Sequence, residues 1–284
     1  MSNIINGKEV ANSICQQLKE TIERSDVIPC LAVIIVGNRT DSKTYVRMKR
    51  KRCKEIGIES ICIELDENVI QEQIIEHIHL LNNNTKIHGI LVQLPLPKHI
   101  DEKEVLKHIS ENKDVDGFHY NNIGKLAKNE NPRFYPCTPE GCVTLLDHYN
   151  IEISGQHVVV VGRSNIVGLP LALMLLHRNA TITICHSKTK NLNEILLKAD
   201  IIIAACGKAE MIQAEWVKNG VVVIDVGINR VDDITKKRGY RLVGDVNFKN
   251  VSKKASYITP VPGGVGPMTI ALLLKHTVEN AINF

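Results

Sequence analysis

Short apolar runs alternate along this chain with segments in which apolar residues recur every three to four positions. The runs have the length of buried strands, and the recurring pattern is typical of helices with one buried face. The predicted strands cover residues 31–36, 60–65, 88–93, 157–161, 181–185, 200–205 and 221–226. The predicted helices include residues 42–56, 69–81, 170–177 and 268–282. Strands that alternate with helices predict an α/β fold built on parallel sheets.

One stretch interrupts this alternation. Residues 117–138 are rich in Asn, Pro, Gly and Lys, which predicts a loop or linker. We therefore expect two α/β domains, the first at residues 1–137 and the second at residues 138–267. The predicted helix at 268–282 follows a glycine-rich loop and carries an apolar stripe, which needs a partner surface.

The composition is that of an ordinary globular protein. Of the 284 residues, 44% are hydrophobic and 23% are charged, which excludes a disordered or collagen-like chain. The net charge of +4 favours small anionic ligands, and an aromatic content of 4% argues against a nucleic-acid partner. The sequence has no apolar run long enough to predict a membrane span, so we expect no membrane partner.

The cysteines and the N-terminus bear on the location of the protein. Eight cysteines are scattered without a Cys-x-x-Cys pair, and several lie inside apolar runs. This pattern predicts reduced thiols rather than disulfides or a zinc site. The first residues lack the basic and apolar segments of a signal peptide. We therefore expect a cytoplasmic protein.

The predicted strand at 157–161 ends in a glycine turn that leads into a helix. A strand, a glycine turn, a helix and a second strand form a mononucleotide-binding unit. Gly162 would allow the tight turn, and Gly168 would let the helix pack closely, with a pyrophosphate near its N-terminus. The spacing is not Gly-x-Gly-x-x-Gly, so a plain strand-to-helix turn is the alternative. The context favours dinucleotide binding.

The end of the next strand predicts the type of dinucleotide. NAD-binding units usually carry an acid there, which holds the ribose hydroxyls. Here His186, Ser187 and Lys188 follow the strand, and a hydroxyl with bases suits a 2′-phosphate. Arg163 is a second candidate phosphate partner. The sequence therefore favours NADP, with NAD as the alternative.

Two other loops are expected to approach the same crevice. Residues 225–229 follow a strand and include Ile228. Residues 259–267 hold three glycines between prolines, which gives a stiff loop whose backbone can come close to a ligand. The alternative is a purely structural turn.

A lysine on the apolar face of the helix at 42–56 is the most informative single residue. At 100° per residue, Lys49 falls within the stripe that includes Tyr45, Cys53 and Ile56. Burial disfavours an ammonium and lowers its pKa, which suits a proton carrier near neutral pH. The alternative is a lysine whose stem packs while its head reaches water.

Two further polar residues fall at informative positions. Gln93 ends a predicted buried strand, where ligand sites of parallel sheets lie, and its amide can orient a lysine and a substrate. An amide that only caps the strand is the alternative. Asp116 precedes a glycine, and Asp-Gly is typical of turns, so the simplest interpretation is that Asp116 only forms a turn. Asp114 and Asp116 could bind a metal, but they lack acidic neighbours, and we expect no metal site.

Six motifs, in order, make the chain closely similar to one known family. They are Tyr45-x-x-x-Lys49, Val92-Gln93-Leu94-Pro95-Leu96-Pro97, Asp114-Val115-Asp116-Gly117-Phe118, Pro136-Cys137-Thr138-Pro139, Gly162-Arg163-Ser164-x-Ile166-Val167-Gly168-x-Pro170 and Pro260-Val261-Pro262-Gly263-Gly264-Val265-Gly266-Pro267-Met268-Thr269. The chain resembles, over essentially its whole length, the bifunctional methylenetetrahydrofolate dehydrogenase/methenyltetrahydrofolate cyclohydrolase family of the bacterial FolD type.

The resemblance implies a fold and an activity. The first domain would bind folate and the second would be a Rossmann-like NAD(P)-binding domain, with the active-site cleft between them. The final helix, residues 268–284, would pack back on the first domain, and the protein would be a homodimer. The implied enzyme oxidises 5,10-methylenetetrahydrofolate with NADP⁺ and hydrolyses the methenyl product to 10-formyltetrahydrofolate. This is one-carbon metabolism, which supplies purine biosynthesis.

The resemblance also implies roles for individual residues. Lys49 matches the catalytic lysine that assists proton movement during hydrolysis, and Gln93 would tune and position it. Tyr45 would stack on the folate, and Asp116 would hydrogen-bond the pterin edge, whose adjacent N–H donors match a carboxylate. The substrate-binding residues expected are Tyr45, Gln93, Asp116, Pro262, Gly263 and Gly264. The cofactor-binding residues expected are Gly162, Arg163, Ser164, Ile166, Gly168, Ser187 and Ile228.

Two motifs depart from the pattern of the family. Tyr120 stands where members often have proline, and Lys188 stands where they often have arginine. Other functions also remain open at this point: a different two-domain NAD(P)-dependent oxidoreductase, or a non-catalytic nucleotide-binding protein. The basic face that Arg47, Lys51 and Lys54 give the helix at 42–56 is expected to be solvated, or to attract the polyglutamate tail of a tetrahydrofolate derivative.

Overall fold

The chain divides into two compact units in the computed structural model, which describes residues 3–236 and 239–283. Asn12–Cys137 and residues 270–283 surround a sheet of three strands and are called the three-stranded unit. Residues 3–11 and Thr138–Thr269 contain a sheet of six strands and are called the six-stranded unit. The division falls within helices α1 (Gly7–Glu23) and α10 (Val265–Ile282), so each helix contributes residues to both units.

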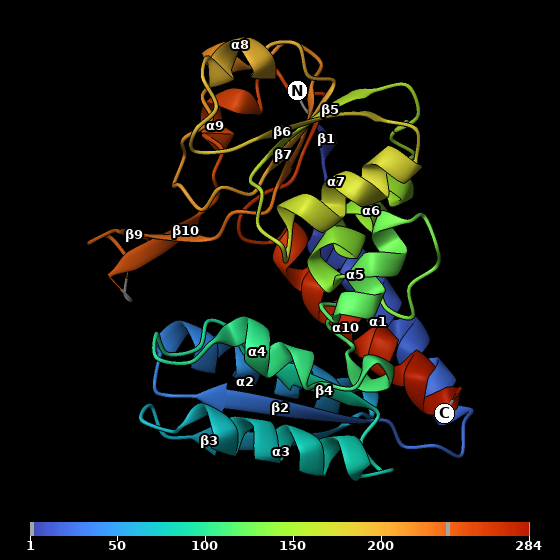
Figure 1. The fold of residues 1–284 in the computed structure, drawn as a ribbon. Coiled ribbons are helices and arrows are strands. Elements are labelled where there is room, and N and C mark those ends of the chain that lie inside the picture. The colour runs from blue at the N-terminus through green and yellow to red at the C-terminus, as the bar shows by residue number, and fades with distance from the viewer. Residues whose placement is uncertain (1–2, 237–238, 284) are drawn as a thin grey trace. The chain divides into compact units, whose positions relative to one another are not determined.

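The three-stranded unit is built on a parallel sheet in the order β3 (Glu59–Leu65), β2 (Cys30–Val36) and β4 (Gly89–Val92). The central strand β2 is buried along its whole length, so side chains of both its faces need cover. One face, which includes Ile34, packs on Ile74 and Ile78 of α3 (Gln71–Asn83). Figure 1 shows α3 and α2 (Thr40–Ile56) on either side of β2.

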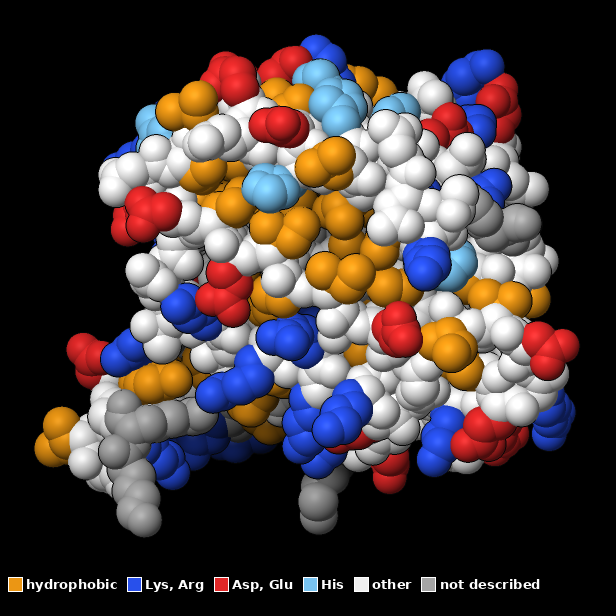
Figure 2. All heavy atoms as spheres, turned by 90° about the horizontal axis from the view of Figure 1, so that it is seen from below, with side chains coloured by type: hydrophobic (Ala, Val, Ile, Leu, Met, Phe, Trp, Pro, Cys, Tyr) orange, Lys and Arg blue, Asp and Glu red, His pale blue; other side chains and the backbone are white. Residues whose placement is uncertain are grey.

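The other short elements of this unit connect its strands and helices. They are α4 (Glu102–Lys107), the 3₁₀ turn at Glu111–Lys113 and α5 (Tyr120–Ala127). Apolar side chains gather at the centre of the face seen in Figure 2, and Ile61, Ile70 and Leu80 are among the more exposed apolar residues of β3 and the α3 region. The side chains of edge strand β3 are therefore less buried than those of the central strand β2.

The six-stranded unit contains a parallel sheet in the order β1-β11-β8-β7-β5-β6. Its strands are β1 (Asn3–Ile4), β11 (Tyr257–Ile258), β8 (Val222–Asp225), β7 (Ile201–Ala204), β5 (His157–Val161) and β6 (Thr181–Cys185). The chain runs from β5 out to β6 and then returns to the other side of β5 to form β7. The strand order therefore reverses beside β5, and ligands of open α/β sheets bind outside the carboxyl ends of strands at such a point.

Helix α7 (Gly168–His177) follows β5 and packs against β5 and β6. The remaining elements of this unit are α6 (Cys137–His148), α8 (Leu192–Leu196), the 3₁₀ turn at Ala214–Trp216, the hairpin of β9 (Asn229–Asp232) with β10 (Tyr240–Val243), and α9 (Phe248–Val251).

The predicted α/β architecture with parallel sheets is confirmed, and each predicted strand overlaps an observed one. The prediction of a loop across residues 117–138 is wrong in part, because α5 lies within it. His119 accepts a hydrogen bond from the Asn121 N–H at the start of this helix, 3.2 Å away. Asn122 is fully buried and donates to Asp114 at 3.0 Å, so this asparagine is part of the helix packing and not of a loop.

Several elements were not predicted from the sequence. They are helix α1, the hairpin β9–β10 and the two-residue strands β1 and β11. A strand of two residues has too few positions to show alternation. Among the described residues, no helix has the length and the apolar character needed to cross a membrane.

The last helix, α10, begins three residues earlier than predicted. Its final part packs within the three-stranded unit through Asn280, which donates from Nδ2 to the carbonyl oxygens of His88 at 2.6 Å and Asn112 at 2.7 Å. Arg133 in turn donates to Asn280 Oδ1 at 2.6 Å. The apolar stripe of α10 is thus accompanied by buried polar contacts that fix its position along the unit.

Candidate active site

Helix α2 places a lysine in the interior of the three-stranded unit. Its buried residues are Ser42, Val46, Lys49, Cys53 and Ile56, a spacing of three to four that marks one helix face. Only 7% of Lys49 is exposed, so the head of the side chain does not reach bulk water. The prediction of a desolvated lysine is confirmed. Burial lowers the pKa of the Lys49 ammonium.

Gln93 lies directly after β4 and holds this lysine. Its Oε1 accepts a hydrogen bond from Lys49 Nζ at 3.1 Å. Its Nε2 donates to the carbonyl oxygen of Leu94 at 2.8 Å, which fixes the amide with its oxygen towards the lysine. The predicted pairing of these two residues is present, although they are 44 positions apart in the sequence.

Asp116 is the charged neighbour of the pair. Burial raises the pKa of the Asp116 carboxyl, while the Lys49 ammonium, the Cys137 thiol and His276 oppose this shift. The same attraction raises the pKa of Lys49 against the effect of burial. The Asp114–Gly117 segment is also a closed turn, because the Gly117 N–H donates to the Asp114 carbonyl at 3.0 Å. Asp116 is therefore both part of a turn and a partly exposed acidic neighbour of the buried Lys49.

Two residues that the sequence did not assign to the site lie next to Asp116. The Cys137 thiol donates to the carbonyl oxygen of Val115 at 3.2 Å, and His276 Nδ1 lies 2.8 Å from the same oxygen, so its N–H donates there. The Cys137 sulfur and His276 Nδ1 are 3.7 Å apart. A histidine within the apolar run of α10 was the only sequence signal for His276, and the Pro-Cys-Thr-Pro motif was the signal for Cys137.

Tyr45 precedes Lys49 by four residues, which places both side chains on neighbouring turns of one helix face. The residue is half-buried, and burial raises the pKa of its phenol. A half-exposed ring beside a buried lysine is suited to stacking on a flat ligand. Lys49, Gln93, Asp116 and Tyr45 thus all belong to the three-stranded unit.

The six-stranded unit carries the expected glycine turn at the carboxyl end of β5. Gly162 has a φ of 141°, and a Cβ there would collide with the Ala205 carbonyl oxygen. A Cβ on Gly168, the first residue of α7, would collide with the Gly162 carbonyl. Because neither glycine has a side chain, the backbone of the turn is accessible at the start of the ten-residue helix α7. The backbone N–H groups of such a helix start can bind a pyrophosphate.

Ser164 has a structural role within this turn. Its Oγ accepts hydrogen bonds from the N–H groups of Val167 at 3.2 Å and Gly168 at 3.4 Å, so it caps the start of α7. The hydroxyl hydrogen can still donate to a phosphate. Ile166 is exposed by 38% in the same turn.

Arg163 and Ser187 follow two neighbouring strands. Val161 of β5 pairs with Cys185 of β6, and the Gly162 N–H donates to the Cys185 carbonyl at 2.8 Å. Arg163 and Ser187, each two residues beyond this pair, are exposed at the same edge of the sheet. A hydroxyl and a guanidinium there are suited to a 2′-phosphate.

Ile228 and residues 262–264 belong to two other loops of this unit. Ile228 comes shortly after β8 and is 44% exposed. The Gly263 carbonyl accepts a hydrogen bond from the Lys8 N–H at 3.0 Å, and Gly264 lies so close to Gly7 that a Cβ on Gly7 would collide with it. Pro262 is exposed. The two glycines therefore allow the loop to pack against the start of α1.

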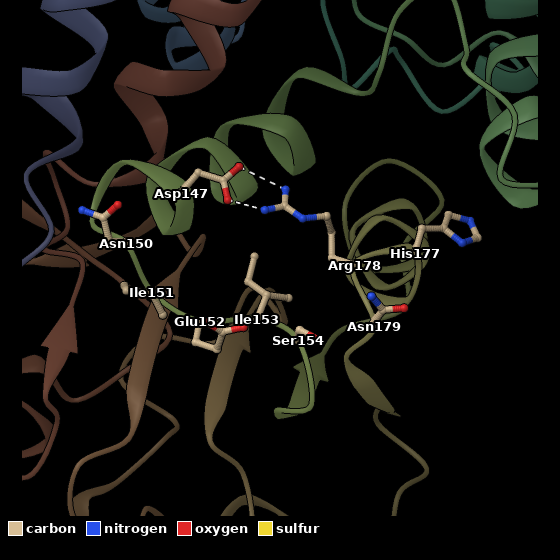
Figure 3. Close-up of a pocket in the computed structure, with 9 residues that line it drawn as sticks. All are labelled: Asp147, Asn150, Ile151, Glu152, Ile153, Ser154, His177, Arg178 and Asn179. Carbon is tan, nitrogen blue, oxygen red and sulfur yellow. Dashed lines mark hydrogen bonds and ion pairs between the residues drawn. The ribbon is translucent and has the colours of Figure 1, made fainter.

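A separate pocket lies at the opposite edge of this sheet. It has a volume of ≈ 480 Å³ and is lined by Asp147, Ile153, Ser154, Arg178 and neighbouring residues. Figure 3 shows Asp147 paired with Arg178 across it. Ser154 precedes β5 and Asn179 precedes β6, so the pocket lies at the amino ends of the strands. Ligands of such sheets bind at the carboxyl ends, and none of the expected site residues lines this pocket.

The fold and the two sites indicate the class of protein to which this chain belongs. One unit has the strand order and glycine turn of a dinucleotide-binding domain, and the other holds a buried lysine with an amide and a carboxylate. Together they define a two-domain α/β enzyme with an NAD(P)-binding domain.

Comparison with known proteins gives the family. The family model for the tetrahydrofolate dehydrogenase/cyclohydrolase catalytic domain matches residues 5–116, and that for the NAD(P)-binding domain of the same family matches residues 136–283. The chain belongs to the tetrahydrofolate dehydrogenase/cyclohydrolase family.

Individual relatives are similar over almost their whole length. Bifunctional protein FolD 2 of Arabidopsis thaliana is 55% identical, over 99% of this chain and 95% of the relative. The crystal structure of the bifunctional FolD enzyme of Campylobacter jejuni is 47% identical with a TM-score of 0.95, over 100% of this chain and 99% of that one. The Trypanosoma brucei FolD structure, complexed with NADP cofactor and an inhibitor, is 43% identical with a TM-score of 0.94, over 98% and 97% of the two chains.

Proposed function

We propose that this protein oxidises 5,10-methylenetetrahydrofolate to the 5,10-methenyl form with NADP⁺ and hydrolyses that form to 10-formyltetrahydrofolate. The observation that carries the proposal is the buried Lys49, held by Gln93 at 3.1 Å and beside Asp116, in a family member with an NAD(P)-binding domain. The 10-formyl product would serve one-carbon metabolism, purine biosynthesis included.

Hydrolysis needs a group that accepts and returns protons. Water adds to the methenyl carbon, a C–O bond forms and a proton must leave. The bond between this carbon and N5 then breaks, N5 takes up a proton and the hydroxyl loses one, so that one proton is released overall. Lys49 is suited to move these protons because burial lowers the pKa of its ammonium towards neutrality.

The neighbours of Lys49 would orient the lysine and the folate. Gln93 accepts from Lys49 Nζ and so directs the amine. Asp116 would accept hydrogen bonds from the N–H groups of the pterin, and the Tyr45 ring would stack on the folate. Residues 262–264 would contact the substrate through the backbone of their loop. These roles are consistent with the burial of the Lys49 environment and the partial exposure of Tyr45.

The residues of the six-stranded unit would bind the cofactor, which when bound supplies the hydride acceptor. The bare turn at Gly162 and Gly168 and the start of α7 would hold the pyrophosphate. Ser164 and Ile166 belong to this turn, and Ile228 would give an apolar contact to the cofactor. Hydride transfer is mainly a matter of alignment, so these contacts govern the dehydrogenase step.

NADP is favoured over NAD by the edge that carries Arg163 and Ser187. β6 is followed by His186, Ser187 and Lys188 rather than by an acid that would hold two ribose hydroxyls. The His186–Thr189 segment is closed by a 2.8 Å hydrogen bond between its ends, which leaves Ser187 and Lys188 exposed at its tip. A lower KM for NAD⁺ than for NADP⁺ would refute this preference.

The activity is tested with purified protein and 5,10-methylenetetrahydrofolate, with NADP⁺ and NAD⁺ in parallel. Reduced cofactor should appear with NADP⁺, and the methenyl form should be hydrolysed in a separate assay without nucleotide. Folded protein that reduces neither cofactor would contradict the dehydrogenase assignment and favour a non-catalytic nucleotide-binding protein. Turnover of a small hydroxy or amino acid instead would favour the other oxidoreductase class.

Polyglutamylated folates are the proposed form of the substrate. Lys43, Arg47, Arg50 and Lys54 recur at helical spacing on α2 and line a groove of ≈ 590 Å³, where Glu64 is the opposing charge. Such a groove suits a chain of carboxylates. Replacing Arg47, Lys51 and Lys54 by Gln should raise KM for a pentaglutamate substrate but not for the monoglutamate. Equal KM changes for both would refute this part.

A homodimer in the cytoplasm completes the proposal. All eight cysteines are free, as expected in a reducing compartment. Sedimentation equilibrium at the mass of one chain would refute the dimer, and fractionation that recovers the protein outside the cytoplasm would refute the location.

A further inference from the structure

A fully buried carboxylate lies under the loops at the carboxyl edge of the six-stranded sheet. Asp245 follows β10 and has no exposed surface. Its Oδ2 accepts from the N–H groups of Cys206 at 2.7 Å and Gly207 at 2.9 Å. Its Oδ1 accepts from the Lys208 N–H at 2.9 Å and from Asn229 Nδ2 at 2.8 Å. Three donors from the loop after β7 and one from the first residue of β9 therefore converge on one side chain.

A second carboxylate holds the backbone of the first. Asp225, the last residue of β8, accepts from the Asp245 N–H at 2.9 Å and the Gly227 N–H at 3.0 Å through Oδ1, and from the Val246 N–H at 2.9 Å through Oδ2. The Asp225 N–H donates to Thr259 Oγ1 at 2.7 Å, where the loop of residues 259–264 begins. We call these contacts the Asp225–Asp245 network.

The network fixes the segments on both sides of the expected cofactor site. The loop at 205–208 follows β7, and the Ala205 carbonyl is the atom that leaves no room for a side chain on Gly162. The segment before Ile228 packs so closely on Asp245 that a Cβ on Gly227 would collide with its carboxyl group. Asp245 therefore binds the residues that follow Ala205, next to the glycine turn, and packs on the residue before Ile228.

We propose that Asp245 is a positioning residue for the nicotinamide cofactor, and that it acts by holding the 205–208 and 227–229 segments in the conformation that binds NADP. Asp245 itself is buried beneath these segments and has all its acceptor sites engaged, so it acts through the backbone it holds. The inference rests on the proposed function, because it assigns the dinucleotide to this edge of the sheet.

The test is an Asp245→Asn variant, which keeps the shape of the side chain. Each carboxylate oxygen accepts two donors, so an NH₂ group at either position loses two hydrogen bonds and faces two donors. We expect the Kd for NADP⁺, measured by calorimetric titration, and the KM for NADP⁺ to rise about tenfold. Hydrolysis of the methenyl form needs no nucleotide and should stay within twofold of the wild type.

The matched control is Asp233→Asn in the exposed segment after β9, where the carboxylate accepts from the N–H and hydroxyl groups of Thr235. It should leave both activities and the Kd unchanged. An Asp245→Asn protein with wild-type affinity for NADP⁺ would overturn the proposal. A folded variant in which NADP⁺ binding and hydrolysis fall equally would overturn it as well, because the role would then be only structural.

If Asp245→Asn does not fold, Asn229→Ala decides the question. It removes one of the four donors, at 2.8 Å from Asp245, and should weaken NADP⁺ binding about threefold while hydrolysis is retained. Unchanged NADP⁺ binding in this variant would overturn the proposal. Wild-type protein that does not bind NADP⁺ would instead refute the proposed function itself.

Discussion

Each unit holds a pair of neighbouring aspartates, and the two pairs have different surroundings. Asp114, Asp225 and Asp245 are buried, whereas Asp116 is partly exposed. Asp114 and Asp116 lie in the three-stranded unit, and Asp225 and Asp245 lie in the six-stranded unit. In each pair, burial raises the pKa of one carboxyl, Asp114 or Asp225, to about 7. Both of these accept hydrogen bonds from backbone N–H groups, which oppose the shift. The first members of the two pairs are therefore alike.

The second members, Asp116 and Asp245, have different neighbours. These neighbours suit Asp116 to a role in proton transfer and Asp245 to a structural role. Asp116 and Lys49 shift each other's pKa by charge attraction, and the Lys49 ammonium can lose its proton, so this region can exchange a proton with a substrate. Asp245 faces three backbone N–H groups and one side-chain amide, none of which can lose a proton at ordinary pH. A carboxylate near an amine is suited to proton transfer, whereas a buried carboxylate bound by amides is suited to holding loops.

Removing the amine tests this distinction most severely. In Lys49→Met, a side chain of similar length keeps the packing of the α2 face but cannot carry a proton. Hydrolysis of the methenyl form should fall about 1000-fold, equivalent to about 4 kcal/mol in the barrier. The rate is measured by following the disappearance of the methenyl form without nucleotide, and NADP⁺ affinity is measured in parallel.

The matched control for this prediction is Lys51→Met, on the exposed face of the same helix. It should hydrolyse the monoglutamate methenyl form, which lacks the tail proposed to reach Lys51, at the wild-type rate. A Lys49→Met protein that retains a tenth or more of the activity would exclude Lys49 as the proton carrier, and a loss of NADP⁺ affinity in this variant would point to a general disturbance of the fold.

The first members of the pairs predict how stability depends on pH. The folded protein keeps the Asp114 proton up to about pH 7, whereas the unfolded chain loses it near the ordinary value of 3.8. The unfolded state therefore binds fewer protons between these values, and stability falls as the pH rises through this window. In Asp114→Asn this decline is absent, so between pH 4 and 7 the variant should gain about 3 kcal/mol relative to the wild type.

Urea unfolding at pH 4, 5.5, 7 and 8.5 measures this difference in stability. The stability of Asp225→Asn relative to the wild type should also rise with pH. Asp233→Asn is the control in which the pH dependence has the opposite sign. Hydrogen bonds from Thr235 lower the pKa of the Asp233 carboxyl, so this variant should lose stability relative to the wild type as the pH rises. A constant difference in stability between wild type and Asp114→Asn across this range would show that Asp114 is ionised in the folded protein.

A carboxylate in place of the Gln93 amide would change the charge beside Lys49 while nearly keeping the shape of the side chain. In Gln93→Glu the added negative charge favours the ammonium form and raises the pKa of Lys49, so less neutral amine is present at pH 7. Hydrolysis at pH 7 should fall about tenfold, and its pH profile should move to higher pH.

Gln93→Met separates this electrostatic effect from the loss of the hydrogen bond. It should lower the rate without moving the profile upward. If the two variants have the same pH profile, Gln93 orients Lys49 but does not tune its pKa.

The sequence was most informative where one helix or one strand end contained the whole signal. Lys49 stood out because a helical wheel places it among apolar residues, and Gln93 because prolines follow a buried run. Lys113 is buried as well, and its Nζ donates to the carbonyl oxygens of Leu81, Asn82 and Asn84 at the carboxyl end of α3. It lies in a 3₁₀ turn of three residues, too short to show any periodicity.

Contacts that the topology alone creates could not be found in this way. Asp225 and Asp245 are 20 positions apart and meet because one ends β8 and the other follows β10. His276 reaches the Val115 carbonyl across 161 positions. A single sequence indicates which face of an element is buried, but it does not indicate which strand end or helix will lie opposite.

His276 gives the smallest expected effect and the finest test of the proton-transfer region. It donates to the carbonyl immediately before Asp116, at 2.8 Å, and its ring packs on Phe134 at a centroid distance of 5.2 Å. His276→Phe keeps a ring but removes the donor, and the loss of one buried hydrogen bond of about 1 kcal/mol should raise KM for the methenyl substrate about fivefold.

His276→Asn, whose amide can donate from nearly the same place, should restore KM. If both variants show the same KM, ring packing and not the hydrogen bond from His276 holds the Val115–Asp116 peptide, together with the Cys137 thiol and the Asp114–Gly117 turn.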